Sequence, residues 1–81
     1  MDMPQHSQVQ GLRDELIEIG QTHDRFDDQD IAARVREIGQ ALCCIGGIES
    51  MQETFHRLED ALHHRPLGLE CAWDGVCGWM V

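Results

Sequence analysis

The four cysteines are the side chains of this chain best suited to chemistry, and their spacing limits what they could do together. Cys43 and Cys44 are neighbours. Adjacent residues of a helix point about 100° apart, so these two neither bridge each other nor readily bind one metal ion. Cys71 and Cys77 would lie about 9 Å apart along a helix, beyond the reach of a disulfide, and a hairpin would not pair them either. The spacing does not exclude a disulfide from Cys43 or Cys44 to Cys71 or Cys77.

Two interpretations of the thiols follow. The first treats the cysteines as small apolar residues packed in or beside the core, because the recognised zinc-binding spacings are absent. The alternative is a thiol-based protein that binds zinc or cycles a disulfide. The residues that it would use are Cys43 and Cys44 with Cys71 and Cys77, and His63 is a further candidate ligand. The N-terminal residues lack the basic and apolar regions of a signal peptide, so we expect a cytoplasmic protein with reduced thiols.

Histidines and glycines give little support to catalysis. His56 and His63 share a helical face but lie two turns apart, about 10 Å, whereas a shared metal ion needs ligands three or four residues apart. The pair Gly46-Gly47 lacks the pattern of a phosphate-binding loop. A nucleophilic cysteine would need a neighbouring base that no spacing here specifies. These observations favour a protein without catalytic residues and without a cofactor.

The charge of the chain restricts its partners. The formal net charge is −9, and it is spread evenly: residues 1–40 hold nine acids against four arginines, and residues 41–81 hold six against two. Nucleic acids and anionic membranes require clustered positive charge, so neither is expected as a partner. No apolar run approaches the roughly 20 residues that span a bilayer. We expect a small acidic protein whose partner is another protein.

Apolar residues recur at steps of three and four in three stretches, which is the pattern of amphipathic helices. Residues 1–6 are expected to form a flexible lead, and residues 7–81 a single helical domain. Ser7 is the predicted cap of the first helix, and Gly20 its end. The three apolar stripes are Val9, Leu12, Leu16 and Ile19, then Ile31, Val35, Ile38, Leu42 and Ile45, then Ile48, Met51, Phe55, Leu58 and Leu62.

The second and third helices are predicted to adjoin. Asp27 or Asp28 is suited to cap the second helix, Gly46-Gly47 to end it, and Pro66 to end the third. A connection this short favours an antiparallel helical hairpin. The last segment, from Leu67, is predicted to be helical through about residues 73–75 and then to continue as a looser turn. A hairpin turning at Asp74-Gly75 is the alternative.

The expected fold is therefore all-α: a small antiparallel bundle of three helices plus a short C-terminal helix. Residues 40–51 and 66–81 carry more apolar side chains than three stripes need, which indicates a second buried surface. We expect a non-catalytic homodimer that acts as a protein–protein interaction module, although both tryptophans could instead fill the chain's own core. The candidate interface residues are Trp73, Trp79, Met80, Asp74 and Ile17.

Two segments, IGQALCCIGGIESMQ and AWDGVCGW, give the chain a resemblance to small helical bacterial proteins, some of them carried on mobile gene cassettes. The resemblance covers about residues 35–80 and brings no activity with it. It implies that the helix–Gly-Gly–helix unit and the Trp-Asp-Gly tail belong to one fold. In that group small residues stand at the positions of Cys71 and Cys77, which argues against a thiol function for these two.

Overall fold

The computed structural model describes residues 4–23, 25–26, 28–63, 66 and 68–79. Its elements are three α-helices, α1 (Pro4–Thr22), α2 (Gln29–Leu62) and α3 (Leu69–Trp73), followed by a 3-10 turn, η1 (Val76–Gly78). The described residues contain no strand, so the prediction of an all-α fold is confirmed. None of the helices in this part of the chain has the length and apolarity needed to cross a membrane.

Helix α1 is longer than its sequence signals suggest at both ends. It begins at Pro4, so residues 4–6 belong to the helix and not to a flexible lead, and Ser7 is not its cap. Proline suits a first turn, where its missing N–H would have had no partner in the helix. The helix also continues past Gly20 to Thr22. A Cβ on Gly20 would come within 2.5 Å of the Leu62 side chain, so this glycine serves close packing and does not end the helix.

Helix α2 contains both of the helices predicted between Asp28 and Pro66. Asp28 is its N-cap, and the Asp28 carboxylate accepts the backbone N–H of Asp30 at 3.2 Å, which confirms one of the two predicted caps. The helix is broken at Gly47, whose φ of 71° and ψ of −165° are not helical. Glycine takes positive φ without steric cost, so the predicted Gly-Gly break occurs at this residue. Residues 29–46 form the first arm of α2, and residues 48–62 form the second arm.

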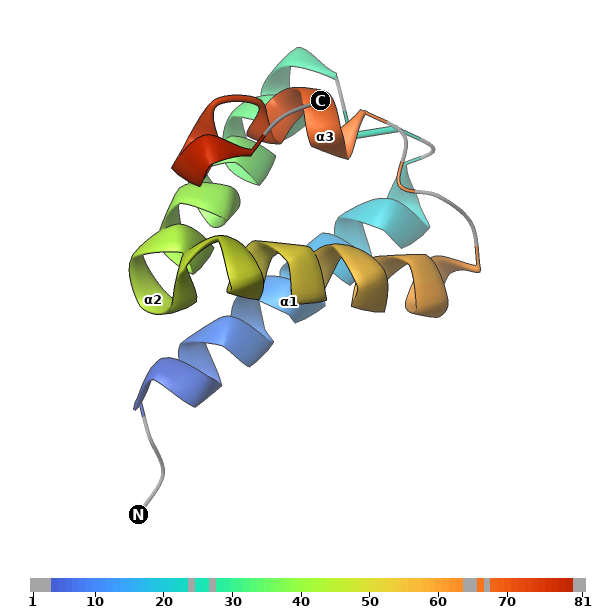
Figure 1. The fold of residues 1–81 in the computed structure, drawn as a ribbon. Helices are drawn as coiled ribbons and strands as arrows, with labels where there is room; N and C mark the ends of the chain where they lie inside the picture. The colour runs from blue at the N-terminus through green and yellow to red at the C-terminus, as the bar shows by residue number, and fades with distance from the viewer. Residues whose placement is uncertain (1–3, 24, 27, 64–65, 67, 80–81) are drawn as a thin grey trace.

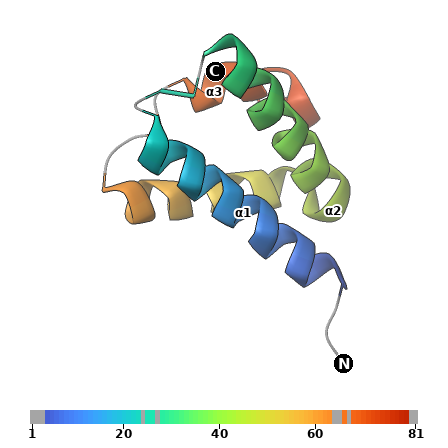
Figure 2. The ribbon, with the colours of Figure 1, turned by 180° about the vertical axis from the view of Figure 1, so that it is seen from behind.

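The two arms diverge from Gly47 and make a V in both views of the ribbon (Figures 1 and 2). The antiparallel hairpin predicted for them is therefore not confirmed. Helix α1 packs across both arms, since Glu15 binds Arg34 of the first arm and Arg13 binds Thr54 of the second. Helix α3 and η1 lie beside the first arm. The second arm ends at Leu62, before the predicted stop at Pro66, and His63 takes a left-handed conformation with φ 59°.

The core lies inside this V and is built largely from the predicted stripes. Its members that are at most 1% exposed are Leu16, Phe26, Val35, Ile38, Leu42, Met51, Leu58, Leu69 and Trp73. Leu69 and Trp73 come from the C-terminal segment. Phe26 also lies outside the three stripes, in the connection between α1 and α2. It is buried because it contacts the region where α1 approaches the end of the second arm: a Cβ on Gly20 would lie 3.0 Å from the Phe26 ring.

Gly39 allows the C-terminal tryptophan to reach the first arm, and its replacement should reveal this contact. A Cβ at Gly39 would lie 2.6 Å from the Trp73 indole nitrogen. We expect Gly39→Ala to lower the free energy of unfolding by about 1–3 kcal/mol, because overpacking against a rigid, buried ring outweighs the gain in helix propensity. Urea denaturation of the purified variant measures the change.

The matched control is Gly11→Ala in α1, where an added Cβ would meet nothing within 4 Å. At protein concentrations where the chain is monomeric, this exchange should raise stability by about 0.5–1 kcal/mol through helix propensity alone. If both exchanges were equally stabilising, the close contact of Gly39 with Trp73 would be refuted.

Candidate functional site

The last described residues of the chain, 69–79, fold over the first arm of α2, and we call them the C-terminal clasp (Figure 1). The prediction of a short helix followed by a looser turn is confirmed by α3 and η1. Glycines make the turns of this segment: Gly68, Gly75 and Gly78 have φ between 81° and 87°. The clasp brings both tryptophans onto α2.

Trp73 anchors the first part of the clasp. Its side chain is 0% exposed, and its Nε1 donates a hydrogen bond to the backbone carbonyl of Val35 at 2.8 Å. Arg36, one residue further along the first arm, donates from Nη1 to the carbonyls of Ala72 and Asp74, at 3.2 and 2.9 Å. The arginine thus caps the carbonyl end of α3, where cations are favoured. Trp73 belongs to the chain's own core and presents no surface to a partner.

Trp79 lies between Trp73 and the second arm of α2. Its ring lies edge-on to Trp73 at a centroid distance of 5.1 Å and tilted against Phe55 of the second arm at 5.9 Å. Such aromatic contacts contribute about 0.5–1.5 kcal/mol beyond the area that they bury. The residue is half-buried. Its Nε1 is nevertheless enclosed, and it alone among the buried side-chain nitrogens and oxygens of the described residues has no hydrogen-bond partner.

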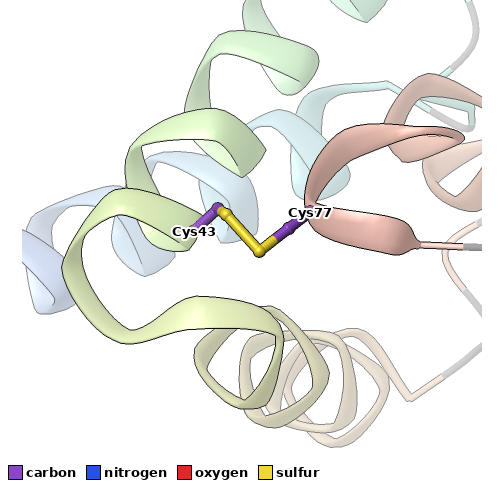
Figure 3. Close-up of a disulfide and its surroundings, with 2 residues drawn as sticks. All are labelled: Cys43 and Cys77. Carbon is purple, nitrogen blue, oxygen red and sulfur yellow. A yellow bond between two sulfur atoms is a disulfide. The ribbon is translucent and has the colours of Figure 1, made fainter.

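A disulfide between Cys43 of the first arm and Cys77 of η1 closes the clasp, with the Cα atoms 5.9 Å apart (Figure 3). The expectation of four reduced thiols is wrong for this pair. The spacing argument correctly rejected the pairs 43–44 and 71–77. It could not choose among the remaining bridges, because that choice depends on where η1 docks.

The other two cysteines are free and exposed. The prediction that all four pack in or beside the core is therefore wrong for Cys44 and Cys71. Within the described part of the chain, no three His, Cys, Asp or Glu side chains gather as metal ligands, and His63 is exposed at the end of α2. Because Cys43 and Cys77 are joined to each other, the structure gives no support to the zinc alternative.

An apolar groove of about 540 Å³ lies between α1 and the first arm of α2. The residues that line it are Gln8, Gly11, Leu12, Ala41, Cys44 and Ile45. The lining contains no Asp, Glu, Lys, Arg or His side chain. The sequence interpretation identified the apolar surplus of residues 40–51 but not the groove, because the groove depends on how α1 crosses α2.

Ile17 lines a different hollow, of about 340 Å³, between α1 and the second arm. Two arginines border it, and both contact the Glu53 carboxylate: Arg13 at 3.4 Å and Arg57 at 3.1 Å. These arginines lower the pKa of Glu53, first through the hydrogen bond from Arg57. Asp60 also lines this hollow. The two arginines there are therefore balanced by two carboxylates, those of Glu53 and Asp60.

An ion pair also joins α1 to the first arm of α2. Arg34 donates from Nε and Nη2 to both carboxylate oxygens of Glu15, at 2.5 and 2.7 Å. This bidentate hydrogen bond lowers the pKa of Glu15 and raises that of Arg34. The Arg34 side chain is 48% exposed, so the pair fixes the register of the helices and contributes about 1 kcal/mol or less.

The predicted interface residues thus fall in separate places. Trp73 is in the core, Trp79 is half-buried in the V, Asp74 is exposed, and Ile17 lies on another face, while Met80 lies outside the described residues. Sequence reasoning missed Arg36 and Gly39. A glycine inside a helical stripe is a recognised sign of close packing, and Gly39 carried that sign.

Comparison of the chain with protein-family models, with curated proteins and with solved structures found no match.

Proposed function

We propose that the protein is a non-catalytic interaction module that pairs with a second copy of itself through the groove between α1 and the first arm of α2. The observation that carries this proposal is the uncharged groove on a chain with a net charge of −9. Two such chains repel each other over most of their surfaces. Self-association therefore requires a surface without charge, and the groove provides one.

The chemistry of the groove favours a second copy over a basic partner. A basic protein would be drawn to the acidic faces of the molecule, whereas the groove offers it no carboxylate. A two-fold contact joins identical patches, so apolar residues meet apolar residues and no charge is buried unpaired. Gly11 and Ala41 are small, which would let the helices of the two copies approach closely.

The test measures the oligomeric state of the full chain by sedimentation velocity. We expect a dimer, and a monomer for Ala41→Glu, which places a carboxylate in the groove. The matched control is Ala33→Glu on the same arm, since Ala33 is exposed and does not line the groove. This variant should still form a dimer. A monomeric wild type, or a dimer that Ala41→Glu leaves intact, would contradict the proposal.

A second measurement uses the free thiol of the groove. We further propose that the two-fold axis passes beside Cys44, so that the free thiols of the two copies meet and mild oxidation cross-links the dimer through them. The variant Cys71→Ser should cross-link like the wild type, and Cys44→Ser should not. Cys71 is a suitable control because it is equally free and exposed but lies on α3.

We retain a cytoplasmic location as part of this proposal. Cytosolic glutathione and thioredoxin keep thiols reduced, and the disulfides found there are usually catalytic or redox-sensing. The bond between Cys43 and Cys77 would then face a reducing solution. This disulfide is also the one observation that favours the alternative function, a protein that cycles a disulfide.

A further inference from the structure

The C-terminal clasp consists of two parts that are held in different ways. Residues 69–74 form the anchor, and α2 holds it without the disulfide. Leu69 and Trp73 are both 0% exposed, and the Trp73 indole donates to Val35. Arg36 adds hydrogen bonds to two carbonyls of the anchor. Breaking the Cys43–Cys77 bond removes none of these contacts.

Residues 75–79 form the flap. The flap relies on the disulfide to stay against α2 much more than the anchor does. The backbone hydrogen bonds described for the flap run within it, from the Gly75 N–H to the Trp79 carbonyl at 2.9 Å and from the Trp79 N–H to the Val76 carbonyl at 2.8 Å. Its ties to α2 are the disulfide, the buried Val76 side chain and the contact of Trp79 with Phe55. The flap is thus a small folded unit joined to α2 by one covalent bond and two apolar side chains, and to the anchor by the edge-on contact of Trp79 with Trp73.

The closed flap contains two unfavourable features. Cys77 has φ 57°, a left-handed conformation that L residues rarely adopt. The Trp79 Nε1 is enclosed without a hydrogen-bond partner, although indole N–H groups usually find one when buried. Opening would relieve both, because Cys77 could take a negative φ and the indole could bind water. Gly75, with φ 84°, lies between anchor and flap and can act as the hinge.

We propose that the Cys43–Cys77 disulfide is a redox latch: its reduction by a dithiol frees the flap to turn about Gly75 and to withdraw Trp79 from Phe55, while the anchor stays docked. The opened V then exposes Trp79 and the Phe55 side of the second arm, an apolar surface distinct from the groove. This inference rests on the clasp and is independent of the proposed dimer.

The chemistry of the latch is thiol–disulfide exchange. A thiolate of the dithiol attacks the sulfur of Cys77, which is the exposed member of the pair, whereas Cys43 is half-buried. The bond between the protein sulfurs breaks, and Cys43 leaves with the electron pair and takes up a proton. The second thiol of the reductant then attacks the mixed disulfide and releases Cys77 as a thiol. Two electrons and two protons pass to the protein, and the dithiol becomes a cyclic disulfide.

The test follows the two tryptophans of the full chain by fluorescence and acrylamide quenching, with dithiothreitol as the dithiol. In the wild type, reduction should shift the emission to longer wavelength and raise the quenching constant several-fold. In Trp79→Phe, where Trp73 alone reports, reduction should change neither value. Cys77→Ser should resemble the reduced wild type without any reductant. The matched control Cys71→Ser should respond to dithiothreitol as the wild type does.

Hydrogen exchange of the unsubstituted protein gives a second measurement that requires no variant to fold. On reduction, the amides of residues 75–79 should lose all protection. Those of residues 69–74 and of α2 should stay protected, but to a lower degree, because loss of the disulfide lowers the global stability that limits their exchange. Unchanged quenching and unchanged exchange in the reduced wild type would overturn the latch. Complete loss of protection in residues 69–74 or in α2 would overturn the division of the clasp into an anchor that stays docked and a flap that is released.

Discussion

Replacing Trp73 with alanine is expected to lower the free energy of unfolding by about 3–5 kcal/mol, the range for removing a large aromatic side chain from a core. Trp73 is 0% exposed and its indole lies directly over Gly39, so neighbouring side chains cannot readily fill the space. The exchange also leaves the Val35 carbonyl without the indole donor. A domain of this size has a stability of roughly 5–15 kcal/mol, so the variant should be near the limit of folding.

Urea denaturation followed by circular dichroism measures this effect, because the signal does not depend on the tryptophan removed. Trp79→Ala is the informative comparison. Trp79 is half-buried and its Nε1 has no partner to lose, so its removal should cost less than that of Trp73. If the two alanine variants were equally destabilised, the distinction between an anchoring and a covering tryptophan would be wrong.

Removing the disulfide is expected to have the second largest effect. The bond joins residues separated by 34 positions. The chain-entropy treatment assigns about 4 kcal/mol to closing a loop of that length, mainly because the cross-link restricts the unfolded chain. We expect the double variant Cys43→Ala/Cys77→Ser to unfold at a correspondingly lower urea concentration than the oxidised wild type.

The control for this prediction is the double variant Cys44→Ser/Cys71→Ser, which removes the two free and exposed thiols. It should unfold like the wild type. Dithiothreitol should lower the urea midpoint of this control and leave that of Cys43→Ala/Cys77→Ser unchanged. Equal midpoints for the two double variants in oxidising buffer would show that the Cys43–Cys77 bond contributes no stability.

The helices and much of the core could be predicted from the sequence. Val35, Ile38 and Leu42 follow helical spacing on the first arm, and all three are buried. Asp28 caps α2, and the helix breaks at Gly47, because hydrogen bonding at a cap and the allowed φ of a glycine depend on only a few neighbouring residues. These features are local, and a pattern of residue types is sufficient to find them.

The candidate site depended on contacts between distant residues. The sequence limited the disulfides to four pairs, and the tertiary structure selected Cys43–Cys77, because η1 docks on the first arm. Gly39 accepts Trp73 only because α3 lies across it. The groove and the separation of Ile17 from both tryptophans depend on the angle at which α1 crosses the two arms. That angle results from packing over the whole molecule, which no short stretch of residues encodes.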